Sequence, residues 1–157
     1  MEIRPVPFGH PDVRTLVAEV QAEYTRLYGG PDNTPIDTTT FDAPQGVFFV
    51  GYVDGVPVAM GGWRRRRDVP AFGRSEAAEI KRMYVVPAAR RTGLARRMLE
   101  HLEATARQAG ADLMVLETGI EQPEAIALYR SAGYEPVTKF GHYAWSPKSR
   151  CFGKPLG

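Results

Sequence analysis

The sequence predicts a single α+β domain, for three reasons. The chain has 157 residues, a length at which one domain buries about 70% of the surface of the unfolded chain. Hydrophobic residues make up 43% of the chain and charged residues 24%, as in ordinary globular proteins. Segments with strand and helix patterns are mixed along the chain, and no repeat, linker or low-complexity tract separates them. We therefore expect residues 1–157 to fold as one domain.

The strand predictions rest most firmly on a β-hairpin in residues 46–63. Two runs rich in β-branched and aromatic residues flank Asp54-Gly55, a dipeptide whose backbone suits a tight type I′ turn. Similar runs predict five more strands, in residues 2–6, 78–86, 112–118, 134–140 and 149–156.

Three helices are predicted from apolar residues that recur every three or four positions. They span residues 13–27, residues 94–110 and residues 123–133, the last with proline at its start and glycine just past its end. Between these elements, residues 30–44 predict a loop with room for one helical turn, and residues 64–75 predict a polar connection.

The basic residues are nearly all arginine, although the net charge is only +2. Arginine binds phosphate through a planar fork of donors, so this bias favours a phosphate-bearing ligand, and codon usage explains it equally well. Four consecutive arginines at 64–67 are expected to be solvated. A nucleic-acid binder would carry a larger basic excess with aromatic residues along a groove, so we expect no nucleic-acid partner.

The single cysteine, Cys151, cannot form an internal disulfide, which predicts a reducing compartment. The first ten residues carry an acid and two prolines where a signal peptide needs an apolar core. The longest apolar run, residues 47–53, is too short to cross a membrane. We expect a cytoplasmic protein without a membrane partner, and without a metal because the three histidines are scattered.

The segment VPAARRTGLARRML, residues 86–99, predicts an anion site at the start of a helix. A helix N-terminus has unpaired N–H groups and partial positive charge, so it binds phosphate when the chain can approach closely. Gly93 leaves the backbone open, and Arg90 and Arg91 add charge. An ordinary helix start has the same pattern, and the chain has neither a dinucleotide fingerprint nor a GK[ST] motif.

This segment resembles the phosphate loop of the GNAT superfamily, the acyl-CoA-dependent N-acetyltransferases, whose pattern is [Q/R]-x-x-G-x-[G/A]. The matching residues are Arg90, Gly93 and Ala95. A second GNAT segment, A-x-x-L-Y-x-x-x-G-[FY], matches Ala125, Leu128, Tyr129, Gly133 and Tyr134. The resemblance covers most of the chain from residue 46 onward, and it implies a three-layer α/β/α fold with a mixed, splayed, mostly antiparallel sheet.

The resemblance also implies acetyl-CoA as co-substrate, in the cleft where the strands at 78–86 and 112–118 splay apart. It implies that the pantetheine amides pair with the backbone of Met83, Tyr84 and Val85. The pyrophosphate would lie on the loop of Arg90, Arg91, Thr92, Gly93, Leu94, Ala95 and Arg96. Gln122 stands where the family often has asparagine, and it remains a candidate for a cofactor contact.

In this family the acetyl group passes directly from sulfur to an amine. An amine of pKa about 10.4 is mostly protonated at pH 7.4, a cost of about 4 kcal/mol that a base can offset. Glu79 matches the position of a catalytic glutamate in several family members, Glu117 is its rival, and Glu76 is less favoured. Tyr129 is the candidate acid for the departing thiolate.

The resemblance therefore predicts an N-acetyltransferase that acts on a primary amine of a small molecule or a peptide terminus. The alternative is a catalytically idle protein of the same fold that binds an acyl-CoA. Glu23, Tyr24, Arg26 and Tyr28 lie where the family shapes its acceptor pocket, while Trp63 and Trp145 are candidates for either this pocket or the core. A homodimer through the last strands is compatible with the sequence.

Overall fold

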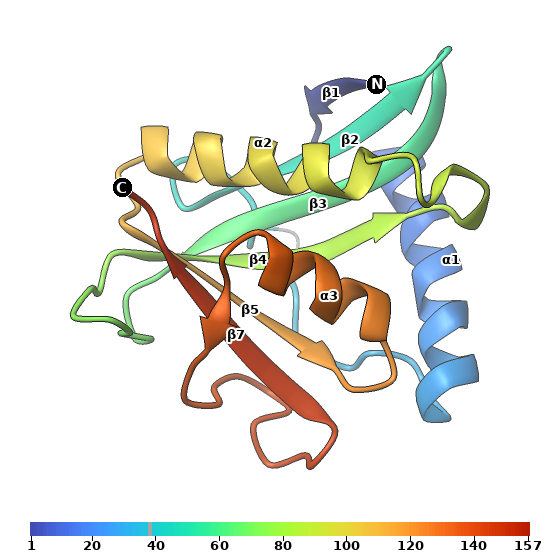
Figure 1. Ribbon diagram of the computed structural model, residues 1–157. Helices are drawn as coiled ribbons and strands as arrows, with labels where there is room; N and C mark the ends of the chain where they lie inside the picture. The colour runs from blue at the N-terminus through green and yellow to red at the C-terminus, as the bar shows by residue number, and fades with distance from the viewer. Residues whose placement is uncertain (38) are drawn as a thin grey trace.

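One open sheet runs through the computed structural model, which describes residues 1–37 and 39–157 (Figure 1). Its strand order is β1-β2-β3-β4-β5-β7-β6. The strands are β1 (Glu2–Pro5), β2 (Gly46–Val53), β3 (Val56–Arg66), β4 (Ala77–Val85), β5 (Leu113–Gly119), β6 (Glu135–Pro136) and β7 (Ser149–Pro155). The helices are α1 (Pro11–Tyr28), α2 (Leu94–Gln108) and α3 (Pro123–Ser131), with a short 3₁₀ turn, η1 (Pro87–Ala89), before α2.

The sheet is mixed and splayed, as the resemblance to the GNAT superfamily implied. Strands β4 and β5 are parallel, while the other described pairs are antiparallel. Pairing between β4 and β5 runs only from Ala77–Leu113 to Ile80–Leu116. Beyond it, β4 continues to Val85 and β5 to Gly119, and the two strands diverge (Figure 1). A register shift against β3 and a φ of 56° at Arg82 bend β4 at this point.

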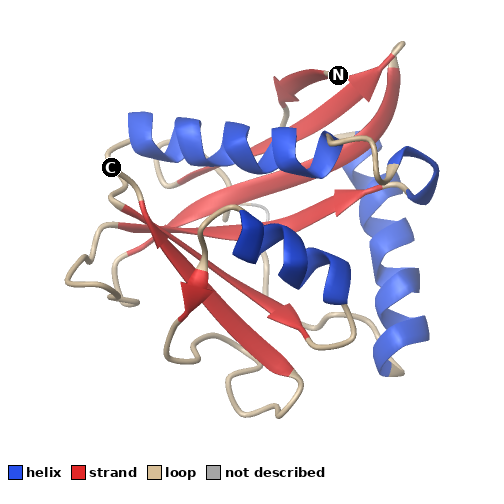
Figure 2. Cartoon of the chain, in the orientation of Figure 1, coloured by secondary structure: helices blue, strands red, loops and turns tan. Residues whose placement is uncertain are grey.

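Helices cover both faces of the sheet, which confirms the three layers (Figure 2). Alternate residues of a strand face opposite sides, and β2 follows this rule. Phe49 packs in the cluster that holds Met98 and Leu102 of α2, while Phe48 packs in the cluster that holds Leu16 of α1. The hairpin is also confirmed, because Asp54 and Gly55 have φ of 51° and 76°, as a type I′ turn requires.

Two predicted boundaries were wrong. Strand β3 extends to Arg66 into the expected polar connection, because carboxylates neutralise its arginines: Arg66 and Arg64 pair with Glu79, and Arg65 pairs with Glu76. The predicted strand 134–140 is reduced to Glu135–Pro136. The Val137 N–H still donates to the Cys151 carbonyl at 3.0 Å, and the chain then leaves β7, so that Phe140 packs in the cluster that holds Leu113 and Cys151.

The loop predicted at 30–44 is confirmed in its described part, where residues 30–37 contain no helix and residues 39–45 form turns. Thr38 lies outside the described residues. The helical turn for which this segment had room is therefore absent from its described residues.

Candidate functional site

A cleft of about 770 Å³ opens where β4 and β5 diverge. We call it the main cleft. Residues from α1, β4, the start of α2, β5 and α3 line it. Its walls are therefore the elements that the splayed sheet holds apart, and its position follows directly from the lost β4–β5 pairing.

The loop between η1 and α2 forms one end of the main cleft. Gly93 caps α2 with a φ of 83°, no side chain caps the helix start, and a Cβ at this glycine would meet nothing within 4 Å. Arg91 also has positive φ, 63°, and Thr92 Oγ1 donates to the carbonyl of Ala89 at 2.5 Å. This compact turn leaves an open helix N-terminus, which is a ready site for phosphate.

The arginines of this loop differ in their surroundings. Arg90 donates from Nε to the carbonyl of Val85 at 2.9 Å and from Nη2 to Glu23 at 2.7 Å, so it ties the loop to β4 and α1. Arg91 is 85% exposed, and its partner Glu124 is exposed as well. The side chain of Arg96 contacts Ser131. Arg91 and Arg96 are therefore the more available cations.

Most of the predicted cofactor residues border the main cleft. They are Met83, Tyr84, Val85, Arg90, Arg91, Gly93, Ala95, Arg96 and Gln122, whereas Thr92 and Leu94 are not among the described residues that line it. One edge of β4 pairs with β3 through Tyr84–Met60 and Val85–Ala59. The other edge has lost β5, so an extended amide-bearing ligand could add to it like a strand.

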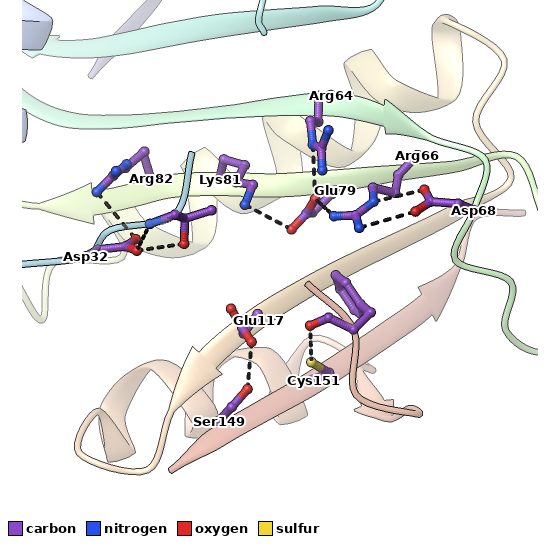
Figure 3. Close-up of polar contacts among 12 residues, drawn as sticks. Asp32, Arg64, Arg66, Asp68, Glu79, Lys81, Arg82, Glu117, Ser149 and Cys151 are labelled. Atoms are coloured by element: carbon purple, nitrogen blue, oxygen red, sulfur yellow. Dashed lines mark hydrogen bonds and ion pairs between the residues drawn. The ribbon is translucent and has the colours of Figure 1, made fainter. Parts of the chain in front are cut away.

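Glu79 is buried in a cluster of cations on the sheet. Its side chain is 3% exposed and lies 2.8 Å from Arg66, 3.1 Å from Arg64 and 3.3 Å from Lys81 (Figure 3). It is absent from the described residues that line the main cleft. Glu79 is thus surrounded by positive charge and positioned to hold β3 and β4 together.

Glu117 lies on β5 beyond the last residue that pairs with β4, and it borders the main cleft. Its carboxylate accepts a hydrogen bond of 2.7 Å from the Ser149 hydroxyl on β7 (Figure 3). Burial raises the pKa of Glu117, while the Ser149 hydroxyl and the charge of Lys81 act in the opposite direction. A half-buried carboxylate of raised pKa on a cleft wall is a candidate proton acceptor.

Tyr129 faces the main cleft from α3 and is 6% exposed. Its ring packs edge-on against Tyr134, with the ring centres 5.7 Å apart. Among the described residues, no hydrogen-bond partner is found for its hydroxyl. Burial raises the pKa of Tyr129, so the phenol remains protonated and able to donate a hydrogen bond.

A second hollow of about 410 Å³ opens beside the main cleft, and we call it the side pocket. Tyr24, Glu117, Thr118 and Gln122 border both hollows. Two loops complete the side pocket: the 30s loop (residues 29–37) and the 140s loop (residues 137–148). Glu117 therefore lies where the two hollows meet.

The GNAT acetyltransferase family model matches residues 17–134, about three-quarters of the chain. The chain belongs to the GNAT family. Its relatives include the IAA acetyltransferase of Azospirillum brasilense, 35% identical over 90% of this chain and 88% of the relative. An uncharacterised N-acetyltransferase of Escherichia coli is 30% identical over 82% and 77% of the two chains.

A solved structure shares the GNAT fold of this chain from end to end. It is a protein of Klebsiella pneumoniae assigned to the acyl-CoA N-acyltransferases, with a TM-score of 0.77 and 29% identity. The match covers 99% of this chain and 97% of the other. The fold and the acyltransferase family predicted from the two sequence motifs are therefore confirmed.

Sequence reasoning missed several residues of the side pocket in this GNAT protein. Asp32, Tyr143 and Lys148 line it from the two loops, and Ser149 lies at the start of β7. A motif could not reveal them, because loop residues become neighbours only through the fold. The four residues expected near the acceptor pocket do border the hollows. Glu23, Tyr24 and Arg26 line the main cleft, and Tyr28 lines the side pocket.

Other prominent residues of the sequence have structural surroundings. Trp63 is 3% exposed and donates from Nε1 to Thr105, so it belongs to the core, whereas Trp145 lines the side pocket. Cys151 is buried on β7. The prediction that the arginines at 64–67 are solvated was wrong for Arg65 and Arg66, which are 7% and 14% exposed, whereas Arg67 is 59% exposed. Each of the four pairs with a carboxylate.

Within residues 1–37 and 39–157, no group of three or more His, Cys, Asp or Glu side chains is placed to hold a metal ion. No helix in the described part of the chain combines the length and the apolar character needed to cross a bilayer.

Proposed function

We propose that this GNAT protein transfers an acetyl group from acetyl-CoA directly to a primary amine. The observation that carries the proposal is the position of Glu117, a half-buried carboxylate where the main cleft meets the side pocket. One hollow can hold the acyl donor and the other the acceptor, so the amine meets the thioester beside this carboxylate.

Acetyl-CoA fits the main cleft in one direction. Its pyrophosphate would lie on the open N-terminus of α2 at Gly93, where Arg91 and Arg96 supply charge. Its pantetheine arm would follow the free edge of β4 from Val85 to Met83. The thioester then arrives near the β4–β5 divergence. The acetyl group is favoured as cargo because relatives of this chain carry acetyltransferase names.

Glu117 is the proposed base, in preference to Glu79. An ammonium group must lose a proton before it attacks the thioester, which costs about 4 kcal/mol for an amine of pKa about 10.4 at pH 7.4. The raised pKa of Glu117 makes it a better proton acceptor than an ordinary carboxylate. Glu79 is held by three cations and lies outside the main cleft, so it does not face the place where the amine would meet the thioester.

Tyr129 is proposed to stabilise the leaving CoA thiolate. The phenol pKa lies above 10, whereas an ordinary thiol has a pKa of about 8.5. Complete proton transfer from Tyr129 to sulfur is therefore uphill. Its main contribution would be a hydrogen bond that strengthens as negative charge develops on sulfur.

The first experiment is calorimetric titration with acetyl-CoA, with ATP and NAD as controls, followed by release of CoA in the presence of primary amines. Selective acetyl-CoA binding with amine-dependent CoA release supports the proposal. Binding without release from a broad amine panel overturns the transferase assignment in favour of an idle acyl-CoA-binding protein. Failure to bind acetyl-CoA overturns both.

A further inference from the structure

We infer that the acceptor is a primary amine carried on an aromatic ring system, and that the side pocket selects it. The inference rests on the proposed function and specifies its substrate class. It follows from three features of the side pocket: its aromatic walls, the arrangement that holds them, and its charge.

Aromatic residues dominate the apolar wall of the side pocket. Tyr28 comes from the end of α1, while Tyr143 and Trp145 come from the 140s loop. The rings of Tyr143 and Trp145 lie 6.5 Å apart, and Trp145 is 77% exposed. An indole ring left open to water beside a hollow provides a surface on which a flat apolar ligand can stack.

The two tyrosines are held in place before any ligand binds. The Tyr143 hydroxyl accepts a hydrogen bond of 2.7 Å from the Asn33 N–H, which joins the 140s loop to the 30s loop. The Tyr28 hydroxyl lies 3.3 Å from Gln122 Nε2, and it packs so tightly on Gly119 that a Cβ there would overlap it. Fixed walls lower the entropic cost of binding a rigid ring.

The charges around the side pocket suit the ammonium end of such a ligand. Asp32 and Glu117 line it. Burial by itself would raise the pKa of Asp32, but hydrogen bonds from Thr34 and the nearby charges of Arg82 and Lys81 lower it, so this carboxylate is ionised at neutral pH.

Two cations, Arg82 and Lys148, lie beside these carboxylates. Arg82 lies 3.4 Å from Asp32 on the main-cleft side (Figure 3). Lys148, the cation among the described residues of the side pocket, lies 4.0 Å from Glu121 and over the Tyr28 ring. The ammonium group is thus directed away from Lys148 and toward Glu117, with the aromatic body against Trp145.

The size of the side pocket agrees with a small molecule. Pockets of roughly 300–1,000 Å³ hold ligands up to the size of a drug, and this one has about 410 Å³. The aromatic acceptor is therefore a compact arylalkylamine rather than a long polyamine.

The test compares tryptamine and phenethylamine with hexylamine, putrescine and glucosamine, by release of CoA from saturating acetyl-CoA. The aromatic amines should have kcat/KM at least tenfold higher than the others. In Trp145→Ala, KM for tryptamine should rise about tenfold while KM for acetyl-CoA stays unchanged. Phe72→Ala is the matched control, because Phe72 is another exposed aromatic residue and does not line either hollow.

Equal or better turnover of hexylamine, putrescine or glucosamine, with no effect of Trp145→Ala, overturns the aromatic acceptor and leaves the acetyltransferase in place. Calorimetry with tryptamine in the presence of CoA tests the side pocket independently of turnover. Tryptamine binding that Trp145→Ala weakens, without turnover of any amine, supports the pocket assignment and overturns the transferase. If aromatic amines neither bind nor are acetylated, the inference is overturned.

Discussion

Glu79 and Glu117 lie on neighbouring parallel strands, on the same face of the sheet, and only Glu117 borders the main cleft. Glu79 is paired in register with Val115, two residues before Glu117 on β5. Lys81 lies near both, in an ion pair with Glu79 and as a charge that lowers the pKa of Glu117. The β4–β5 pairing ends at Ile80–Leu116. Glu79 therefore lies within the paired part of the sheet, whereas Glu117 lies just beyond it, at the main cleft.

The first prediction concerns the effect of Glu117→Gln on catalysis. Loss of a general base costs about 10²–10⁴-fold in rate, so we expect kcat to fall at least 100-fold with acetyl-CoA affinity nearly unchanged. Steady-state kinetics and calorimetry measure the two quantities. Wild-type turnover in this variant would remove Glu117 from the mechanism.

Glu79→Gln should act on stability instead. The substitution leaves Arg64, Arg66 and Lys81 without their shared carboxylate in a largely buried place. Breaking a buried ion pair costs about 3 kcal/mol, so we expect the free energy of unfolding to fall by about this amount in urea titrations. A variant of wild-type stability whose kcat is 100-fold reduced would instead mark Glu79 as catalytic.

A third prediction tests the phosphate loop at Gly93. Gly93→Glu places a carboxylate beside the expected pyrophosphate and should weaken acetyl-CoA binding at least 100-fold. Gly93→Ala is the matched control, because it imposes the same strain at a φ of 83°, at a cost of about 1 kcal/mol, without adding charge. Calorimetry on both folded variants decides the matter, and equal affinities would contradict a phosphate site here.

The Tyr129 hydroxyl gives a fourth prediction. Tyr129→Phe retains the ring that packs on Tyr134 and removes only the donor to the departing sulfur. We expect kcat to fall about tenfold to 100-fold, at or below the lower limit of the roughly 10²–10³-fold loss when one oxyanion-hole donor is removed. Acetyl-CoA affinity and melting temperature should not change. Full activity would leave Tyr129 with a packing role alone.

The raised pKa of Glu117 gives a prediction on stability against pH. The folded state holds this proton more tightly than the unfolded state, whose ordinary value is 4.5. Protonated Glu117 therefore contributes stability that is fully present below pH 4.5 and is lost as pH rises through the folded pKa. Glu117→Gln lacks this loss, so its stability relative to the wild-type protein should rise between pH 4.5 and 7.5. Urea unfolding across this range measures the difference, and a decrease with pH would contradict the assignment.

The sequence by itself determined most of the elements and predicted the cofactor end of the site. The hairpin at Asp54-Gly55, the α1 and α2 patterns and the Gly93 helix start are local, because turn geometry and residue periodicity depend on neighbours in the chain. Two motifs in order then predicted the GNAT family.

Only the tertiary structure placed Glu117 at the main cleft and Glu79 outside it, and only the tertiary structure assembled the side pocket. Both glutamates lie on strands, and the point at which β4 and β5 separate depends on a bulge and on pairing between distant segments. Asn33 and Tyr143 are 110 residues apart, yet a hydrogen bond joins them. Loop positions of this kind follow from the packing of the whole domain, so no pattern within the chain could have predicted them.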